Sequence, residues 1–122
     1  MELIIDFNSD EAIYVQLCNQ IIMGIATSTL QEGDSLPSVR ALADDIGINM
    51  HTVNKAYGIL KQEGFVKLDR RKGAIVCIDP DKARIMNRMK KEMAITVARC
   101  ICNGVTRKET HELIDELYDS FV

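Results

Sequence analysis

Residues 36–76 read LPSVRALADDIGINMHTVNKAYGILKQEGFVKLDRRKGAIV and carry the clearest structural signals of the chain. A short helix is predicted after Ser38, whose hydroxyl can act as an N-cap, and Gly47 ends it in a left-handed conformation. Asn49 follows almost at once as a second N-cap, so the next helix must cross the first sharply. That second helix is expected to run to about Glu63. The spacing therefore predicts a helix-turn-helix.

A β-hairpin is predicted directly after the second helix. Residues 65–69 and 74–78 alternate or run apolar, as strands do, and Gly73 permits the positive φ of a tight turn between them. Three consecutive cations would lie at the hairpin tip, where they suit contact with phosphates or with the minor groove. These cations are Arg70, Arg71 and Lys72. The order of helix, turn, helix and hairpin is that of a winged helix-turn-helix, an α+β fold.

The second helix is the expected recognition helix, the element that such a fold places in the DNA major groove. Its core face is predicted to consist of Val53, Ala56, Tyr57 and Leu60. The residues that remain on other faces are of hydrogen-bonding types, namely His51, Thr52, Asn54 and Lys55. Asn can pair with adenine, Lys can donate to guanine, and a Thr methyl can touch thymine. This polarity favours base contacts over burial.

The segments LPSVRALADDIGIN, TVNKAY and LKQEGFV and the basic tip before KGAIV resemble the DNA-binding domain of GntR-family bacterial transcription regulators, over about residues 10–78. The resemblance implies DNA contact by Arg40, Thr52, Asn54, Lys55 and the wing tip. With the residues above, the expected DNA-contacting set is Arg40, Asn49, His51, Thr52, Asn54, Lys55, Arg70, Arg71, Lys72 and Gly73. The wing departs from the family's Gly-x-Gly-Thr-Phe-Val-like pattern, because a cation replaces one glycine.

Two amphipathic helices are expected after the hairpin, in residues 79–122, with residues 1–78 forming the winged domain. Asp79 is predicted to cap the first helix with Pro80 at its first position, and Thr106 and Glu109 to form a capping box on the second. Their apolar faces are too broad for isolated helices. Pairing with a second chain is therefore expected through Ile85, Met89, Met93, Val97, Ile101, Leu113, Leu117 and Phe121.

The short helical tail resembles the YtrA-type branch of the family, whose small C-terminal segment dimerises. That resemblance implies a homodimeric repressor of a nearby operon, often one for a transporter, with double-stranded operator DNA as its partner. A two-fold dimer would present its recognition helices to half-sites about one helical turn, or a multiple, apart. A small-molecule effector would have to lie between the C-terminal helices or at the dimer seam, where Met86, Met89 and Met93 offer adaptable apolar contacts.

The composition is that of a small domain with a packed core: 122 residues, 47% of them hydrophobic, with a formal net charge of -3. The charges are segregated, with acids at both ends and cations in residues 65–91, so the net charge does not describe the local DNA-facing surface. Neither a membrane-spanning run nor a signal peptide is predicted. The four cysteines lie in apolar contexts and indicate reduced thiols and a cytoplasmic protein.

The sequence leaves room for other interpretations. A metal site at Cys100, Cys102 and His111 is disfavoured, because helical residues two apart point about 200° apart. Neither a cofactor nor enzymatic activity is expected, since the sequence has no phosphate-binding glycine loop and no histidine near a nucleophile. The alternative function is that of a winged-helix protein-interaction module without specific DNA binding. Finally, residues 3–7 are expected to form either a short strand or an arm packed on the domain.

Overall fold

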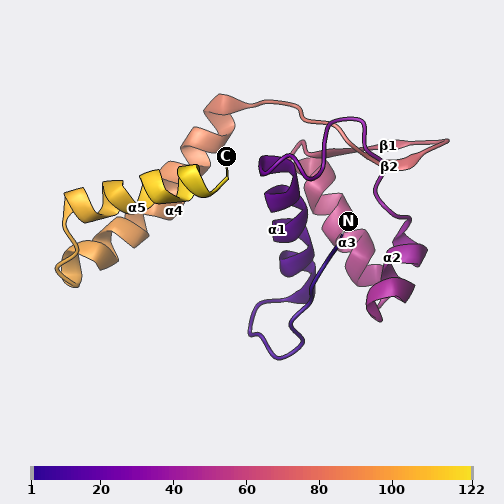
Figure 1. The fold of residues 1–122 in the computed structure, drawn as a ribbon, viewed down its shortest axis with the longest axis horizontal. Coiled ribbons are helices and arrows are strands. Elements are labelled where there is room, and N and C mark those ends of the chain that lie inside the picture. The colour runs from indigo at the N-terminus through magenta and orange to yellow at the C-terminus, as the bar shows by residue number, and fades with distance from the viewer. Residues whose placement is uncertain (1, 122) are drawn as a thin grey trace. The chain divides into compact units, whose positions relative to one another are not determined.

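The computed structural model describes residues 2–121, which form two compact units that divide between Asp79 and Pro80. The first unit contains α1 (Ile13–Ala26), α2 (Val39–Ile46), α3 (Met50–Gln62), β1 (Val66–Asp69) and β2 (Gly73–Val76). The second unit contains α4 (Lys82–Cys102) and α5 (Arg107–Ser120) (Figure 1). Three helices followed by a two-stranded antiparallel wing, then a helical segment, make an α+β fold, as predicted.

The helix-turn-helix forms where its caps were predicted. The Ser38 Oγ accepts a hydrogen bond from the Ala41 N–H at 3.0 Å and begins α2. Gly47 adopts φ 77°, a left-handed conformation that costs glycine little, and so ends that helix. The Asn49 Oδ1 then accepts from the His51 N–H at 2.7 Å and begins α3. The turn between the helices is therefore fixed by local chemistry at both of its ends.

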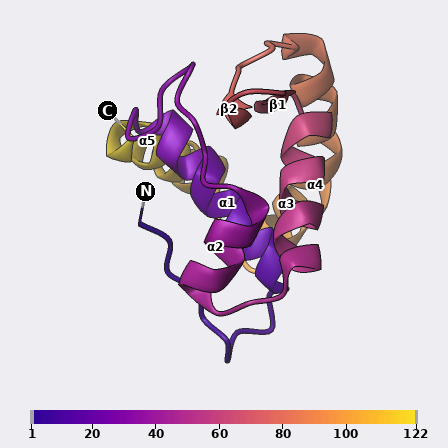
Figure 2. The ribbon, with the colours of Figure 1, turned by 90° about the vertical axis from the view of Figure 1, so that its right-hand side faces the viewer.

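Helix α3 is the centre of the first unit, with α1 and α2 packed against it and the hairpin following its C-terminal end (Figure 2). All four residues of its predicted core face are buried. They join apolar side chains from every other element of the unit in one cluster, which includes Leu17, Ile21, Leu42, Ala43, Val66, Ala74 and Val76. Since one face of α3 is fully used for packing, the opposite face is free to be polar.

The hairpin forms as predicted, with a three-residue loop, but its strands differ from the predicted ones. Strand β1 begins at Val66 instead of residue 65, and β2 runs from Gly73 to Val76 instead of from 74 to 78. Asp69 pairs with Gly73 at its closed end and Val66 with Val76 at its open end. Residues 33–36 also pair with β2, an arrangement that was not predicted. The Leu36 N–H donates to the Ala74 carbonyl at 2.8 Å, and Asp34 accepts from Val76 at 2.9 Å. Strand β2 therefore lies between β1 and this loop, which anchors the wing to the domain.

The N-terminal residues form an extended arm, held by two glutamine side chains of α1. The Gln20 amide accepts from the Ile4 N–H at 2.9 Å and donates to the Ile4 carbonyl. The Gln16 amide accepts from the Asp6 N–H at 2.9 Å and donates to the Asp6 carbonyl at 3.0 Å. Each glutamine side chain thus makes, with one residue of the arm, the pair of backbone hydrogen bonds that a neighbouring β-strand would make. Of the two arrangements considered for residues 3–7, the packed arm is the one observed.

The second unit begins later than predicted. Helix α4 starts at Lys82, and Asp81 is its N-cap, because the Asp81 Oδ1 accepts from the Arg84 N–H at 3.0 Å. The prediction of Asp79 as cap and Pro80 as first helical residue is wrong. The Asp79 N–H donates to the Gly64 carbonyl at 2.9 Å, which keeps this residue in the first unit. Helix α5 does begin with the predicted capping box of Thr106 and Glu109.

Candidate nucleic-acid interface

The residues predicted to contact DNA all lie on the surface of the first unit. Nine of the ten are exposed and Thr52 is half-buried. They come from three places: the first turn of α2 (Arg40), the start and first turns of α3 (Asn49 to Lys55), and the wing tip (Arg70 to Gly73). The predicted core positions of α3 are buried. The polar residues of α3 are therefore available to a ligand of the unit.

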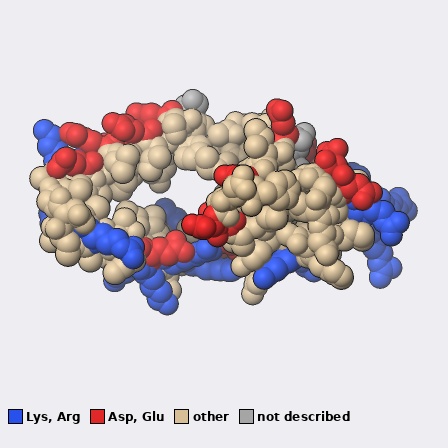
Figure 3. Space-filling model, turned by 90° about the horizontal axis from the view of Figure 1, so that it is seen from below, with Lys and Arg blue, Asp and Glu red and all other residues tan. Residues whose placement is uncertain are grey.

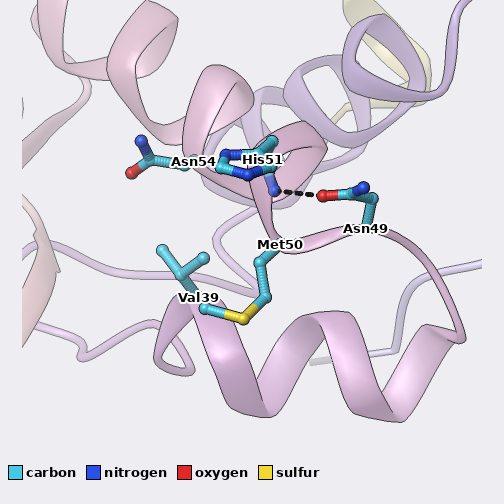
Figure 4. Close-up of a pocket in the computed structure, with 5 residues that line it drawn as sticks. All are labelled: Val39, Asn49, Met50, His51 and Asn54. Atoms are coloured by element: carbon cyan, nitrogen blue, oxygen red, sulfur yellow. Dashed lines mark hydrogen bonds between the residues drawn. The ribbon is translucent and has the colours of Figure 1, made fainter.

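The start of α3 lines an open groove of about 650 Å³ together with the start of α2. Its polar lining consists of Asn49, His51 and Asn54, and Figure 4 shows their side chains around the first turn of α3. Its apolar lining consists of Val39 and Met50. Met50 is not among the residues predicted to contact DNA. Its position directly after the Asn49 cap was the available signal, since the first residues of a recognition helix are those that reach base edges.

The side chain of Lys55 has a partner on another helix. Its Nζ lies 4.0 Å from the centroid of the Tyr14 ring, which belongs to α1. A lysine ammonium at this distance over an aromatic face is attracted by the ring quadrupole, by about 0.5–1 kcal/mol at exposed sites. The interaction directs the cation toward α1 in the free protein. Donation by Lys55 to guanine would require the ammonium to leave this ring.

The wing tip is shaped by Asp69. Its Oδ1 accepts hydrogen bonds from the N–H groups of Lys72, at 3.0 Å, and Arg71, at 2.7 Å. These two bonds hold the pKa of the Asp69 carboxyl below its usual range. Gly73 closes the loop with φ 75°. The result is a folded tip with three exposed cationic side chains, and Lys and Arg residues gather at the hairpin end of this unit in Figure 3.

Tyr57 connects the recognition helix to the segment before α2. Its hydroxyl donates to the Pro37 carbonyl at 2.7 Å, one residue before the Ser38 cap. Burial raises the pKa of the Tyr57 hydroxyl to about 12, because the charged phenolate would be poorly solvated there. The bond fixes the start of α2 against α3. It therefore helps to hold Arg40 and the first turn of α3 in one orientation.

The residues predicted for dimerisation lie on α4, on α5 and directly after α5, and none of them is buried within the chain. Ile85, Met89, Val97, Ile101, Leu113 and Leu117 are exposed, with Ile101 at 72%, whereas Met93 and Phe121 are half-buried. Neither α4 nor α5 contributes a buried residue. An isolated soluble domain rarely exposes so many neighbouring large apolar side chains. This face is therefore the candidate interaction surface of the second unit.

Metal sites, membrane spans and cysteines are the other features that bear on function. Within residues 2–121, no group of three His, Cys, Asp or Glu side chains is arranged to hold a metal ion, and no helix is both long and apolar enough to cross a membrane. The cysteines are free thiols. Cys18 is buried and its Sγ donates to the Ala56 carbonyl at 3.4 Å; burial, followed by the nearby Glu63, raises its pKa to about 11.

Comparison with known proteins identifies the first unit. Residues 13–76 match the family model of bacterial regulatory proteins of the gntR family. The transcriptional repressor YtrA of Bacillus subtilis is 31% identical over 116 residues, which cover 93% of this chain and 89% of that protein. The structure of YtrA from Sulfolobus acidocaldarius, a GntR-family transcription factor, is similar with a TM-score of 0.68, at 35% identity and over 82% of this chain and 97% of that one.

A further structure resembles the whole chain. It is that of a transcriptional antiterminator from Listeria monocytogenes EGD-e, with a TM-score of 0.87 and 27% identity over 99% of this chain and 92% of that one. The matches therefore extend from the winged unit into the C-terminal helices. The helix-turn-helix geometry, the family match over residues 13–76 and the full-length relatives agree: the chain belongs to the GntR family of bacterial transcription regulators, as a YtrA-like member.

Proposed function

We propose that this chain is a homodimeric, sequence-specific DNA-binding repressor of an operon near its own gene. The observation that carries the proposal is the division of α3 into a fully packed face and an exposed polar face, with the cationic wing on the same unit. Apart from Met50, the exposed side chains of α3 are of hydrogen-bonding types, which suit base edges and phosphates better than another protein. Operons for transporters are the first targets to test, given the resemblance to the YtrA branch.

Base recognition is assigned to the start of α3, and affinity to the wing and to Arg40. His51 and Asn54 are exposed beside the groove and can donate to and accept from base edges in the major groove. The cations at the wing tip can neutralise phosphates, which raises affinity for any duplex and makes it depend on salt. The two groups of residues thus have separable effects. Losses in the first reduce sequence preference, and losses in the second reduce total affinity.

The dimer is assigned to the apolar face of α4 and α5. Two copies would bury side chains such as Ile101 and Leu117 against one another, which one copy leaves in water. A two-fold dimer carries two recognition helices and therefore binds a palindromic site more tightly than either half could alone. Repression follows if this site overlaps a promoter. An effector, if one exists, would act at the seam by changing the distance between the recognition helices.

A gel-shift titration tests the proposal directly. The DNA is the region upstream of the protein's own operon, and the comparison is the same sequence scrambled, at one fixed moderate salt concentration. We expect tight binding to the first only. Asn54→Ala should remove much of this preference, since a good base contact contributes roughly 1–3 kcal/mol of discrimination. Equal affinity for both duplexes would contradict the proposal and favour a protein-interaction module.

The wing is tested by its effect on salt dependence. Replacing Arg70, Arg71 and Lys72 by Ala should weaken binding to both duplexes alike and reduce the slope of log affinity against log salt by about one unit per lost phosphate contact. Lys61→Ala is the control for loss of a surface cation outside the wing, because Lys61 is exposed in the last turn of α3. A wing variant that kept the salt slope of the wild type would show that the tip does not contact phosphates.

A further inference from the structure

Met50 is an unusual residue for its position in the structure. It is the first residue of α3, and its side chain is 42% exposed. It belongs neither to the buried core nor to the partly buried side chains packed against that core, although Val39 is among the latter. A large share of an apolar side chain is therefore left in water here. The polar side chains of Asn49, His51 and Asn54 surround it in the same groove.

The Met50 side chain joins the starts of two helices. Figure 4 shows it extending from the first turn of α3 toward Val39 in the first turn of α2. Both residues line the groove, so that together they provide an apolar patch among polar groups. Arg40, adjacent to Val39, is exposed. The patch thus lies among the residues to which the proposed function assigns DNA contact, rather than at the edge of that surface.

The chemistry of the patch selects one kind of base edge. In the major groove, the C5-methyl group of thymine is the apolar feature among the four base pairs, and the other edges present donors and acceptors. Asn54 lies four residues after Met50 and therefore on the same side of α3. An Asn side chain is suited to the N6 and N7 atoms of adenine. The flexible, polarizable thioether of Met adapts well to a small apolar group.

We propose that Met50, supported by Val39, is a specificity-determining residue that binds the 5-methyl group of a thymine in each operator half-site, next to the base that Asn54 reads. This inference rests on the proposed function, because it requires the start of α3 to enter the major groove. The contact would specify thymine at one position of the half-site, which the hydrogen-bonding residues alone do not specify. A half-site with cytosine or uracil at that position would be bound more weakly.

The experiment starts from duplexes selected by the full-length protein from a random pool. In the selected half-site, each thymine is replaced in turn by deoxyuracil, which lacks only the 5-methyl group, and affinity is measured by fluorescence anisotropy. We expect one thymine per half-site at which the replacement weakens binding about three- to fourfold, the effect of losing one buried methyl-sized contact. Changing that T·A pair to C·G should weaken binding further. Replacing that cytosine by 5-methylcytosine should then raise affinity three- to fourfold over the unmethylated C·G duplex.

Two variants link the effect to Met50. Met50→Ala should bind thymine and deoxyuracil duplexes equally, whereas Met50→Leu, which keeps an apolar side chain, should retain most of the difference. Circular dichroism checks that both variants fold, which their exposed position favours. If selection enriches no sequence, the proposed function fails and this inference with it. If selection succeeds but no deoxyuracil replacement matters, or the penalty persists in Met50→Ala, the function stands and the assignment to Met50 is overturned.

Discussion

The two units of this chain solve the problem of burying apolar side chains in different ways. In the first, side chains from three helices and the hairpin meet in one core, and Leu17, Ile21, Val53, Leu60 and Val76 are inaccessible to solvent. In the second, α4 and α5 carry apolar residues at regular spacing, yet none of these residues is buried. The first unit can be stable by itself. The second has helices with apolar faces but no surface that covers those faces. The proposed dimer would provide one.

The largest effect is expected from a charge placed on the uncovered face of α4. Val97 is 40% exposed and lies one turn from Met93 on the apolar face. In the proposed dimer, Val97→Glu would bury one carboxylate from each copy. Each uncompensated buried charge costs roughly 3–5 kcal/mol of dimer stability. We expect a dissociation constant of the dimer raised by more than a hundredfold. Sedimentation equilibrium of the full chain measures it, and affinity for a palindromic operator should fall in parallel.

Asn87→Glu is the control for this variant. Asn87 is exposed, lies on α4 away from the apolar face, and its replacement changes the charge by the same amount. It should leave the association state unchanged. A wild-type chain that is monomeric at micromolar concentrations, or a Val97→Glu variant that dimerises like the wild type, would contradict the role given to this face.

The next effect is expected in the core of the first unit. Leu60 is fully buried in α3, so Leu60→Ala should lower the free energy of unfolding by about 2–5 kcal/mol, independent of protein concentration. Leu113 on α5 is 55% exposed, and Leu113→Ala should affect stability only through the dimer, hence more strongly in concentrated than in dilute solution. Urea denaturation at two protein concentrations separates these behaviours. Equal concentration dependence in both variants would remove the distinction between the units.

Much of the first unit was predictable because its signals are local. Each of these signals lies within a few residues of the structure that it determines. They are the Ser38 and Asn49 caps, the left-handed Gly47 and the cations before Gly73. The predicted face of α3 is buried for the same reason, since helical periodicity alone places its four residues together. For the second unit, the capping box of Thr106 and Glu109 is likewise a local arrangement.

The features that were missed depend on contacts between distant residues. The Asp79 cap was wrong because the backbone of Asp79 bonds to Gly64, a partner that no local pattern reveals. The pairing of residues 33–36 with β2 and the position of Lys55 over Tyr14 also join separate elements. Met50 was not predicted to contact DNA because base contact by a recognition helix is signalled mainly by polar residues. The groove that it shares with Val39 exists only after α2 and α3 have packed.

A smaller effect, specific to the first unit, is expected at alkaline pH. The pKa of Tyr57 rises from its ordinary value of 10 to about 12 on folding, so its contribution to stability is complete below pH 10 and is lost as the pH rises through 12. Tyr57→Phe should lower the free energy of unfolding by about 1 kcal/mol at pH 7, because it leaves the Pro37 carbonyl without its hydrogen bond.

The pH profile distinguishes this bond from general packing. The variant should lose stability less steeply between pH 10 and 12 than the wild type does, as measured by urea denaturation at a series of pH values. Cys18, with its pKa raised to about 11, contributes to the slope in both proteins, so the difference between them isolates Tyr57. Parallel profiles over this range would show that the Tyr57 hydroxyl ionises as easily in the folded protein as in the unfolded one.

The smallest effect is expected at the capping box of the second unit. Thr106→Ala removes the hydroxyl that accepts from the Glu109 N–H at 3.1 Å and should cost α5 about 0.5 kcal/mol, the lower end for an exposed cap. The backbone and side-chain hydrogen bonds from Thr106 hold the pKa of Glu109 below its usual range, so the stabilisation is present above the unfolded pKa and is lost as the pH falls through the folded one. If the second unit folds only as a dimer, this cap will shift the dimer midpoint slightly while leaving the unfolding of the first unit unchanged. A loss of stability in the first unit would instead mean that the two units unfold together. The units would then differ in how much apolar surface they bury, but not in whether they are stable independently.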